Sequence, residues 1–486
     1  MNRRLSQLLL LGFFLLTPQA VAQSAASKPA EKDGSDADAI QLADRIQGQV
    51  ETIRGLKFLK PVAKGIYDKE RLAKFLQQQM EKEGAAATFA WQQKAYRLLG
   101  LIPETYDMLQ ETTEILLEQI GGFYDPETKE LKVMKGFGGA IGEMLMAHEL
   151  CHALEDQHFD LQHTFDSLSK IAKEDDDRSF AARAVVEGSA TDLMFKFMVK
   201  KMQSGEVSLE ELQSPEMMSN PAFSGEKAMS APPIMVKPLM EAYLGGAKFL
   251  ARGGFMPGSA KKRDQNKGFL SMPLSSEQVL HPEKYWDETQ ADEPQALELP
   301  DASAALGAGW KRIGTNVLGE LGVAILTTPW SPPKKGEKPD MEKMQAEMMK
   351  PSTNDEASGW DGDRYAIYEG PQNALGLAWA SVWDSEKDAR EMAEALEMLA
   401  ADRKRDGIVL KFTQKGASVY AGWANGAAGA AVAEKLAELA AQAKPQTYAK
   451  LEVKLPEGSE GMKLEKKPKK AEAEKGSGGA EAGGEK

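Results

Sequence analysis

The stretch GEMLMAHELCHALEDQHFD, from Gly142 to Asp160, determines the fold and the chemistry that we expect for this 486-residue chain. It contains the pattern H-E-x-x-H from His148 to His152, in a sequence with five histidines in all. Residues four apart lie on one face of an α-helix, so both imidazoles can bind one metal ion, with Glu149 at the edge of that face. The apolar neighbours of the motif indicate a buried helix. The alternative is a pair of core histidines beside a surface glutamate.

A zinc site needs a third ligand, and His158 is the nearest candidate in the sequence. In the pattern H-E-x-x-H-x-x-G-x-x-H, a glycine ends the helix and brings the last histidine to the metal. This chain has Glu155, a good helix former, at that position. In a continuous helix, His158 lies about 15 Å along the axis from His148 and cannot share its ion. His163 is further away still, so we expect neither to be a ligand.

Glu187 is the other candidate ligand, because it lies within the apolar segment RAVVEGSATDL (183–193) of a second predicted helix. A carboxylate in such surroundings is costly to bury unless it is paired. A zinc ion would supply that partner. An ion pair with a basic residue such as Arg183 is the alternative.

HELCH followed by Glu187 resembles the gluzincins, which are zinc peptidases with H-E-x-x-H and a glutamate from the next helix. The resemblance covers about residues 115–200. It implies that the hairpin predicted at FYDPETKELKVMKG is an edge strand that holds the substrate in extended form. The stretches GFYDP, HALEDQHFD and EQVLHPEKY also resemble segments of exported bacterial proteins of this class, mostly of unknown substrate. The site implied is one Zn²⁺ with His148, His152 and Glu187 as ligands and Glu149 as general base.

One departure from the gluzincin pattern concerns the residues around the metal. Thermolysin-like members have an aspartate four residues after the glutamate, where it orients a ligand histidine. This chain has Thr191 at that position and Asp192 one residue later. The partner that orients the histidines is therefore left unassigned.

The reaction expected of such a site is hydrolysis of a peptide bond. Three protein ligands leave zinc a fourth position for water, whose pKa falls to about 7. Glu149 would take a proton from this water during attack on the carbonyl and pass it to the leaving amine. Peptidases of this type commonly use a later histidine or tyrosine as a donor to the oxyanion, so His281 and Tyr285 are our candidates. The alternative for His281 is that it only caps a loop.

The N-terminal segment and the charge of the chain limit where the protein works. Arg3 and Arg4, the apolar run Leu8–Leu16 and the small residues at 20–22 are typical of a secretory signal peptide, which we predict at 1–22. We therefore expect export to the periplasm or the extracellular space. No later run is long enough to span a membrane, and the net charge of −13 argues against a nucleic-acid partner.

The spacing of apolar residues predicts an α+β fold. A mainly helical, zincin-like metallopeptidase domain with the edge hairpin is expected at 38–330, with helices throughout 39–118. Strand patterns then predict a small β-β-α-β-β-α domain at 359–445. The other segments are a flexible linker (23–37), an insertion loop (203–235), a loop (331–358) and a disordered tail (456–486).

These features together predict an exported zinc endopeptidase that acts on peptide or protein substrates. The alternative is a non-catalytic binding or assembly protein on a zincin scaffold, with residues 203–486 as its working part. The sequence indicates neither the oligomeric state nor the cleavage specificity.

Overall fold

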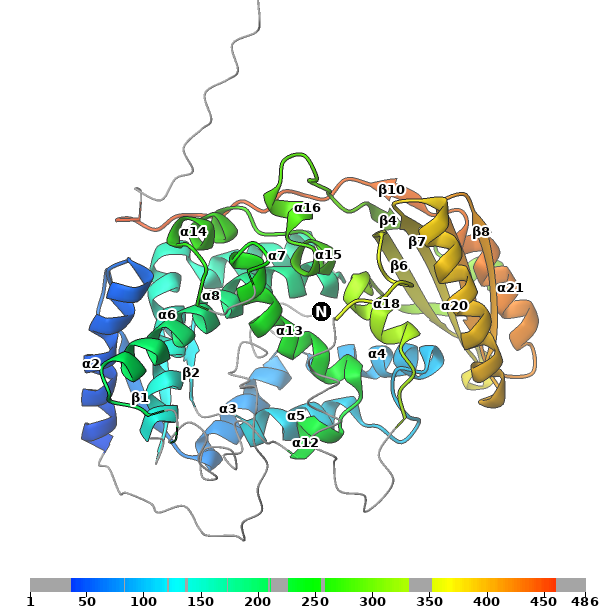
Figure 1. Ribbon diagram of the computed structural model, residues 1–486. Helices are drawn as coiled ribbons and strands as arrows, with labels where there is room; N and C mark the ends of the chain where they lie inside the picture. Colours follow the sequence, from blue (N-terminus) through cyan, green and yellow to red (C-terminus); the bar gives the residue numbers. More distant parts are fainter. Residues whose placement is uncertain are drawn as a thin grey trace, which may run out of the picture.

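A computed structural model describes residues 36–459, apart from 83, 120–121, 136–138, 173, 209, 211–225, 255–257 and 332–351 (Figure 1). The predicted signal peptide lies outside the described residues. So do most of the linker and the tail, and parts of the two predicted loops. The described chain is a mixed α+β structure, as expected. None of its helices combines the length and apolarity needed to cross a membrane.

The N-terminal part is helical with one exception. Its helices are α2 (Asp36–Arg54), α3 (Lys69–Lys82), α4 (Ala85–Leu99) and α5 (Met108–Gln119). The prediction of helices throughout 39–118 was wrong at β1 (Ala63–Tyr67), which pairs in parallel with a strand far along the chain. Five residues are too few to reveal a strand period, and the pairing partner decides the conformation.

The predicted hairpin consists of β2 (Gly122–Asp125) and β3 (Glu130–Met134), which pair antiparallel. Its turn is stabilised by Asp125, whose carboxylate accepts the backbone N–H of Glu127 at 3.0 Å. The sheet order is β1-β3-β2, so β2 forms one edge. This edge lies beside the helix that carries H-E-x-x-H.

Three long helices form the centre of the helical part: α6 (Gly139–Phe159), α8 (Asp176–Gln203) and α13 (Pro233–Leu250). Two shorter helices, α7 (Leu161–Ile171) and α12 (Glu226–Ser230), flank them. Helix α8 lies between α6 and α13 and is buried along most of its length (Figure 1). Most of its buried residues are apolar, but they include the charged Arg183, Glu187 and Asp192.

Helices α8 and α13 cross at two glycines. A Cβ atom on Gly246 would lie 2.0 Å from the carbonyl oxygen of Ala184. A Cβ atom on Gly188 would lie 2.2 Å from the carbonyl carbon of Gly246. Any larger residue would separate the two backbones, so both glycines fix this crossing.

The segment between the helical part and the C-terminal sheet consists of short elements. They are α14 (Lys262–Leu270), α15 (Ser276–Leu280), α16 (Glu283–Trp286), β4 (Ala296–Glu298), α17 (Ser303–Leu306), β5 (Lys311–Asn316) and α18 (Gly319–Thr327). Strand β4 pairs with β10 (Lys444–Gln446), so the chain returns across this segment after the sheet is complete.

The C-terminal elements follow the predicted β-β-α-β-β-α order. They are β6 (Trp360–Glu369), β7 (Leu375–Trp383), α20 (Glu386–Arg405), β8 (Val409–Lys415), β9 (Ser418–Ala424) and α21 (Gly429–Ala440), with a short 3₁₀ turn, η1 (Pro371–Asn373), after β6. The sheet order is β5-β6-β7-β9-β8 with antiparallel neighbours. Strand β5 comes from outside the predicted range 359–445. Its polar sequence, KRIGTN, gives no alternation that would predict a strand.

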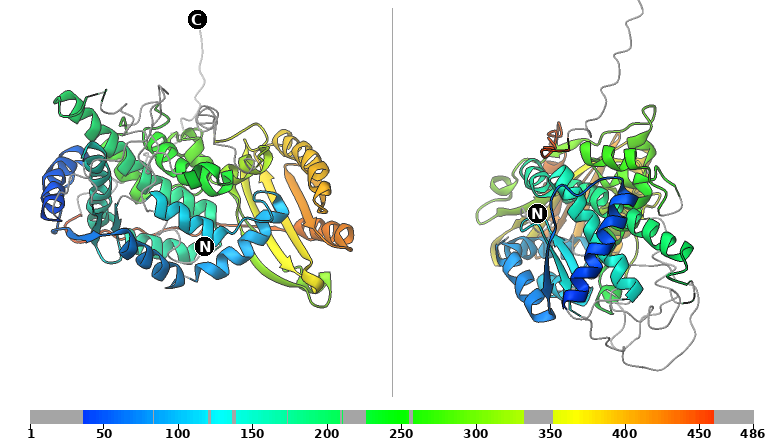
Figure 2. Two further views of the ribbon diagram at one scale, coloured as in Figure 1. Left: turned by 90° about the horizontal axis from the view of Figure 1, so that it is seen from below. Right: turned by 90° about the vertical axis from the view of Figure 1, so that its left-hand side faces the viewer.

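The sheet lies at one end of the helical part and packs directly on it (Figure 2). One hydrophobic core contains Val185 of α8, Leu321 of α18 and Trp379 of β7, together with the inner side of α20. Helix α21 covers the opposite face, where its Leu436 packs with Ala378. The helical part and the sheet therefore share a continuous core.

Candidate metal centre

The structure brings together His148, His152 and Glu187 at the contact between α6 and α8. The Nε2 atoms of the two histidines are 3.0 Å apart, and Glu187 Oε2 lies 3.1 Å from His148 Nε2 and 3.5 Å from His152 Nε2. Zinc bonds of about 2.0–2.1 Å in a tetrahedron place ligand atoms about 3.3 Å apart. The spacing of these three atoms therefore fits the ligands of one zinc ion.

The chemistry of this group also suits a cation. Burial alone would raise the pKa of Glu187, but His152 and His148 outweigh burial and lower the pKa to about 2. Burial lowers the pKa of His148 to about 4, so its imidazole is neutral and has a lone pair. For His152, burial lowers the pKa, but the Glu187 carboxylate raises it more, to about 9. A bound metal ion would displace the proton of His152.

Arg183 does not pair with Glu187, which removes the alternative explanation for a glutamate in this helix. No ion pair joins the two side chains in the described structure, where Glu187 instead contacts both histidines. The carboxylate of Glu187 is fully buried, and its Oε1 atom has no hydrogen-bond partner among the described residues. A buried oxygen of this kind is expected where a metal or a water binds.

Glu149 lies next to these residues and is oriented by the edge strand. Its Oε2 atom accepts the backbone N–H of Tyr124 at 2.8 Å, while Oε1 has no hydrogen-bond partner among the described residues. Burial raises the pKa of Glu149 to about 8. A carboxyl group with a pKa near neutrality and one available oxygen is suited to proton transfer.

Tyr124 fixes β2 to α6 at a second point. Its hydroxyl donates to Asp156 Oδ2 at 2.7 Å, two helical turns after Glu149. Lys129 also donates to this carboxylate, at 2.8 Å. The N–H of Tyr124 therefore orients Glu149. It is not available to an extended substrate along this strand.

Tyr243 is a neighbour of the site that the sequence did not predict. Its ring stacks on that of His148, with centroids 5.7 Å apart and planes at 20°. The tyrosine reaches this position because α13 crosses α8 at Gly188, directly after Glu187, and at Gly246, three residues after Tyr243. The glycine pair at 245–246 within an apolar helix was the available indication of a close crossing.

His158, which the sequence predicts not to be a metal ligand, contacts a different part of the structure. Helix α6 continues through Glu155 to Phe159, and His158 Nε2 contacts the carbonyl oxygen of Lys57 at 2.7 Å. Glu155 is buried and accepts Arg54 Nε at 2.6 Å. The continuous helix carries His158 away from the other two histidines, as expected.

Asp192 contacts residues other than the candidate zinc ligands. It accepts Lys196 Nζ at 2.5 Å and the backbone N–H of Ala260 at 3.0 Å. Gln265 Nε2 lies 3.2 Å from it. These contacts assign Asp192 to holding the segment at Ala260, and they give it no part in orienting the histidines. Thr191, the residue at the thermolysin-like position, is buried and its hydroxyl has no partner among the described residues.

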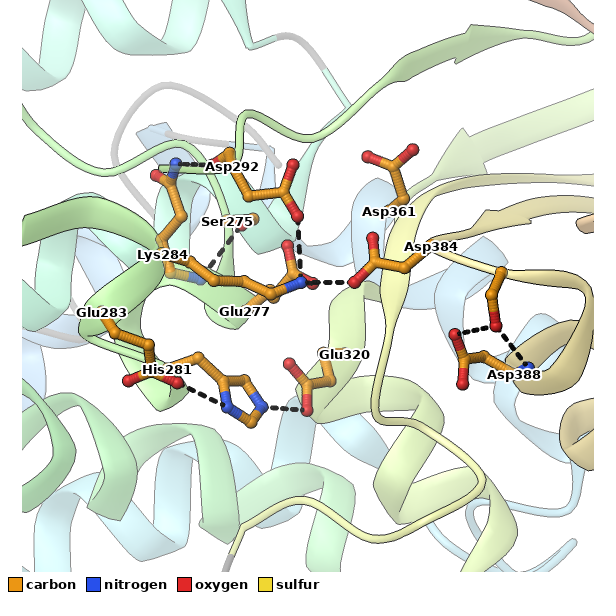
Figure 3. A network of polar contacts seen from close by, with 12 residues as sticks. Ser275, Glu277, His281, Glu283, Lys284, Asp292, Glu320, Asp361, Asp384 and Asp388 are labelled. Carbon is orange, nitrogen blue, oxygen red and sulfur yellow. Dashed lines mark hydrogen bonds and ion pairs between the residues drawn. The ribbon is translucent and has the colours of Figure 1, made fainter. Parts of the chain in front are cut away.

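The two candidate oxyanion donors, His281 and Tyr285, contact residues other than the three candidate ligands and Glu149. His281 Nε2 contacts Glu320 Oε1 at 2.9 Å, and its Nδ1 lies 3.5 Å from Glu283 (Figure 3). The hydroxyl of Tyr285 donates to the carbonyl oxygen of Ser271, and its ring packs on Phe249. Both side chains are thus engaged with other partners, which gives no support to the predicted role of either as the oxyanion donor. The segment 277–286 folds toward the C-terminal sheet, which its local sequence does not reveal.

A second cluster of acidic residues, Glu277, Asp292 and Asp384, also has the spacing of metal ligands. Figure 3 shows that the ammonium of Lys284 lies between them. It is 2.5 Å from Glu277, 3.0 Å from Asp292 and 2.7 Å from Asp384. The lysine already supplies the positive charge, so this network is an ionic link between α16 and the end of β7.

Comparison with known protein families gives a match to the C-terminal part of the chain. A family described as a domain of unknown function (DUF8575) matches residues 306–435. This range begins just before β5 and ends within α21, so it contains the whole five-stranded sheet but neither α6 nor α8. No curated protein and no solved structure matches the chain.

Proposed function

We propose that this protein is an exported zinc-dependent peptidase of the gluzincin type. The observation that carries the proposal is the convergence of His148 Nε2, His152 Nε2 and Glu187 Oε2 within 3.5 Å, beside a buried Glu149 with one available oxygen. We also propose that the helical part has a zincin-like fold. Export is proposed from the signal-like segment at 1–22.

Each side chain has a distinct part in the proposed reaction. His148, His152 and Glu187 would hold the ion, and a bound zinc supplies a Lewis acid that lowers the pKa of water and polarises a carbonyl. Glu149 would accept the proton of the attacking water at Oε1, while Tyr124 holds its Oε2. The same carboxyl group would then protonate the leaving amine.

The test compares Glu149→Gln with a matched variant on the same helix. Glu143 is also on α6, but it pairs with Lys201 at 2.8 Å and is outside the site, so Glu143→Gln is the control. We expect Glu149→Gln to keep its zinc and to lose about 10²- to 10⁴-fold in peptide hydrolysis, whereas Glu143→Gln stays near the wild-type rate. Equal rates in both variants would refute the role of Glu149.

The second candidate function is a non-catalytic binding or assembly protein. The burial of the site favours it, since His148, Glu149, His152 and Glu187 are each at most 4 % exposed. Zinc bound without turnover of any peptide in a diverse library would support this candidate. A partner captured equally well by the wild type and by Glu149→Gln would support it further.

A further inference from the structure

A mainly apolar cavity of about 140 Å³ lies between α8, α13 and the helices around them. Side chains from several elements line it, among them Met80, Phe89, Leu116, Phe180, Leu239 and Leu321. Cavities of this kind bind apolar groups and use a small number of polar groups to orient them.

Arg183 is the basic side chain in this lining, and two of its nitrogens lack hydrogen-bond partners in the described structure. It is 4 % exposed, and its Nε and Nη1 atoms have no hydrogen-bond partner among the described residues. The carboxylates of Glu187 and Asp176 act on this charge from nearby, but neither forms an ion pair with it in the described structure. A buried guanidinium with unfilled hydrogen bonds is costly, because its N–H groups have lost water and gained no acceptor in return. Such a group is expected where an anion binds.

The cavity adjoins the candidate metal centre along two helices. On α8, Arg183 precedes Glu187 by four residues, which is one turn or about 6 Å along the axis. On α13, Leu239 of the cavity precedes Tyr243, the neighbour of His148, by the same four residues. Arg183 and Leu239 are therefore the lining residues of α8 and α13 that stand closest, along these helices, to Glu187 and Tyr243.

Acidic groups line the cavity further from the metal centre, and they already have partners. Asp176 precedes Arg183 by seven residues, about 10 Å along the axis, and its Oδ2 accepts Gln92 at 2.7 Å. The Asp177 carboxylate accepts the backbone N–H of Ser276 at 3.0 Å. An anionic ligand group is therefore favoured only at the Arg183 end.

We infer that Arg183 binds the C-terminal carboxylate of a peptide whose last residue is apolar and lies in this cavity. The inference rests on the proposed peptidase function and names its substrate class. One residue of extended chain spans about 3.3–3.6 Å and a charge-assisted hydrogen bond about 2.8 Å. The inference therefore needs the guanidinium to lie about 6 Å from the carbonyl that water attacks, and Arg183 is one turn before the ligand Glu187 on the same face of α8.

This placement makes the protein a carboxypeptidase, in place of the endopeptidase expected from the sequence. The last C–N peptide bond breaks and a C–O bond to water forms. One water proton passes through Glu149 to the leaving amine. The products are one free apolar amino acid and a peptide that is one residue shorter, with a new C-terminal carboxylate.

Binding to the zinc-loaded full-length Glu149→Gln protein tests the inference without turnover. The probes are N-acetyl-Ala-Ala-Phe as the free acid, the same peptide as its C-terminal amide, and N-acetyl-Ala-Asp-Phe amide, which has a side-chain carboxylate. We expect calorimetry to give about ten- to hundredfold tighter binding of the free acid than of either amide. Equal affinity of the free acid and its amide would overturn the inference. So would tight binding of the aspartyl amide, because a side-chain carboxylate would then be the ligand.

Adding Arg183→Gln to this protein separates the role of the guanidinium from other effects. We expect the preference for the free acid to disappear while the zinc content is unchanged. A preference that survives this change would overturn the inference. Arg183→Met is the folding control, because loss of a buried charge that has no ion pair in the described structure should leave the thermal unfolding temperature equal or higher. Arg183→Lys keeps the charge but cannot form two parallel hydrogen bonds to a carboxylate, so it should keep only part of the preference for the free acid.

Zinc content distinguishes failure of this inference from failure of the proposed function. A zinc-loaded protein that hydrolyses peptides but binds the acid and the amide equally would retain the peptidase proposal and lose the role of Arg183. A metal-free protein that still binds the free acid through Arg183 would retain the carboxylate site and lose the peptidase proposal.

Discussion

Glu187 Oε2 lies 3.1 Å from His148 Nε2, although 39 residues separate the two in sequence. The contact exists because α8 runs past α6 with Glu187 on the facing side. Gly188, the next residue, lets α13 approach from the other side. A carboxylate in this position is buried among apolar residues, and the two histidines are its partners.

Removal of zinc should destabilise the protein if the ion binds the folded state only. An ion whose free concentration is a hundredfold above its Kd raises the free energy of unfolding by about 2.7 kcal/mol. We expect a chelator to lower the unfolding temperature of the wild type and to leave that of Glu187→Gln unchanged. A wild-type transition that does not respond to the chelator would contradict a structural contribution from the metal.

Tyr243 should act through its ring. Tyr243→Ala removes the surface on which His148 stacks, so zinc affinity should fall about 10- to 100-fold, as it does when groups that orient metal ligands are lost. Tyr243→Phe keeps the ring and should bind zinc nearly as the wild type does. Competition with a chromogenic chelator measures both. An equal loss of zinc affinity in the two variants would contradict this prediction, because the hydroxyl and not the stacked ring would then support zinc binding.

The helix crossing should not tolerate a methyl group. Gly246→Ala places Cβ against the backbone of Ala184, and we expect it to lower the free energy of unfolding by about 1–3 kcal/mol or more. Gly48→Ala is the matched control, because this exposed glycine of α2 has no neighbour within 4 Å of an added Cβ. In Gly48→Ala the free energy of unfolding should rise by about 0.5–1 kcal/mol. Urea unfolding measures both, and similar values for the two variants would refute the close crossing.

His281 should matter for stability and not for hydrolysis. His281→Asn weakens a contact to the buried Glu320 carboxylate, so the free energy of unfolding should fall by about 1–3 kcal/mol while the hydrolytic rate stays unchanged. The hydrogen bond that His281 donates to Glu320 raises the pKa of His281, and it outweighs burial, which lowers this pKa. Glu283 raises the pKa and Lys284 lowers it to smaller extents.

The pH dependence of this effect follows from the raised pKa. The ionic part of the contact is fully present below the unfolded-state pKa of about 6.5 and is lost as the pH rises through the higher folded-state value. The difference between the wild type and His281→Asn should therefore be larger at pH 6 than at pH 9. A difference that grows toward pH 9, or a large loss of hydrolysis, would contradict this assignment.

The parts of the fold that were predictable are those with a local signal. Helix α6 could be predicted to pass Glu155 because nothing in its sequence ends a helix, and this excluded His158 as a ligand. Glu187 could be selected because a carboxylate inside an apolar helix needs a partner. The strands and helices from Trp360 to Ala440 have clear periods and alternate as predicted.

The parts that were not predictable depend on contacts between distant segments. Strand β1 is a strand because β3 lies beside it, and β5 because β6 does. Tyr243 reaches His148 only through the crossing of α13 with α8. His281 was placed at the site by analogy with other peptidases, whereas its actual partner, Glu320, follows it by 39 residues.

The zinc content of the purified full-length protein tests the central claim most directly. Plasma mass spectrometry should find one zinc per chain in the wild type and in Glu143→Gln. It should find far less in Glu187→Gln, which lacks the third ligand. A metal-free wild type, or a Glu187→Gln variant that retains a full equivalent of zinc, would contradict the account.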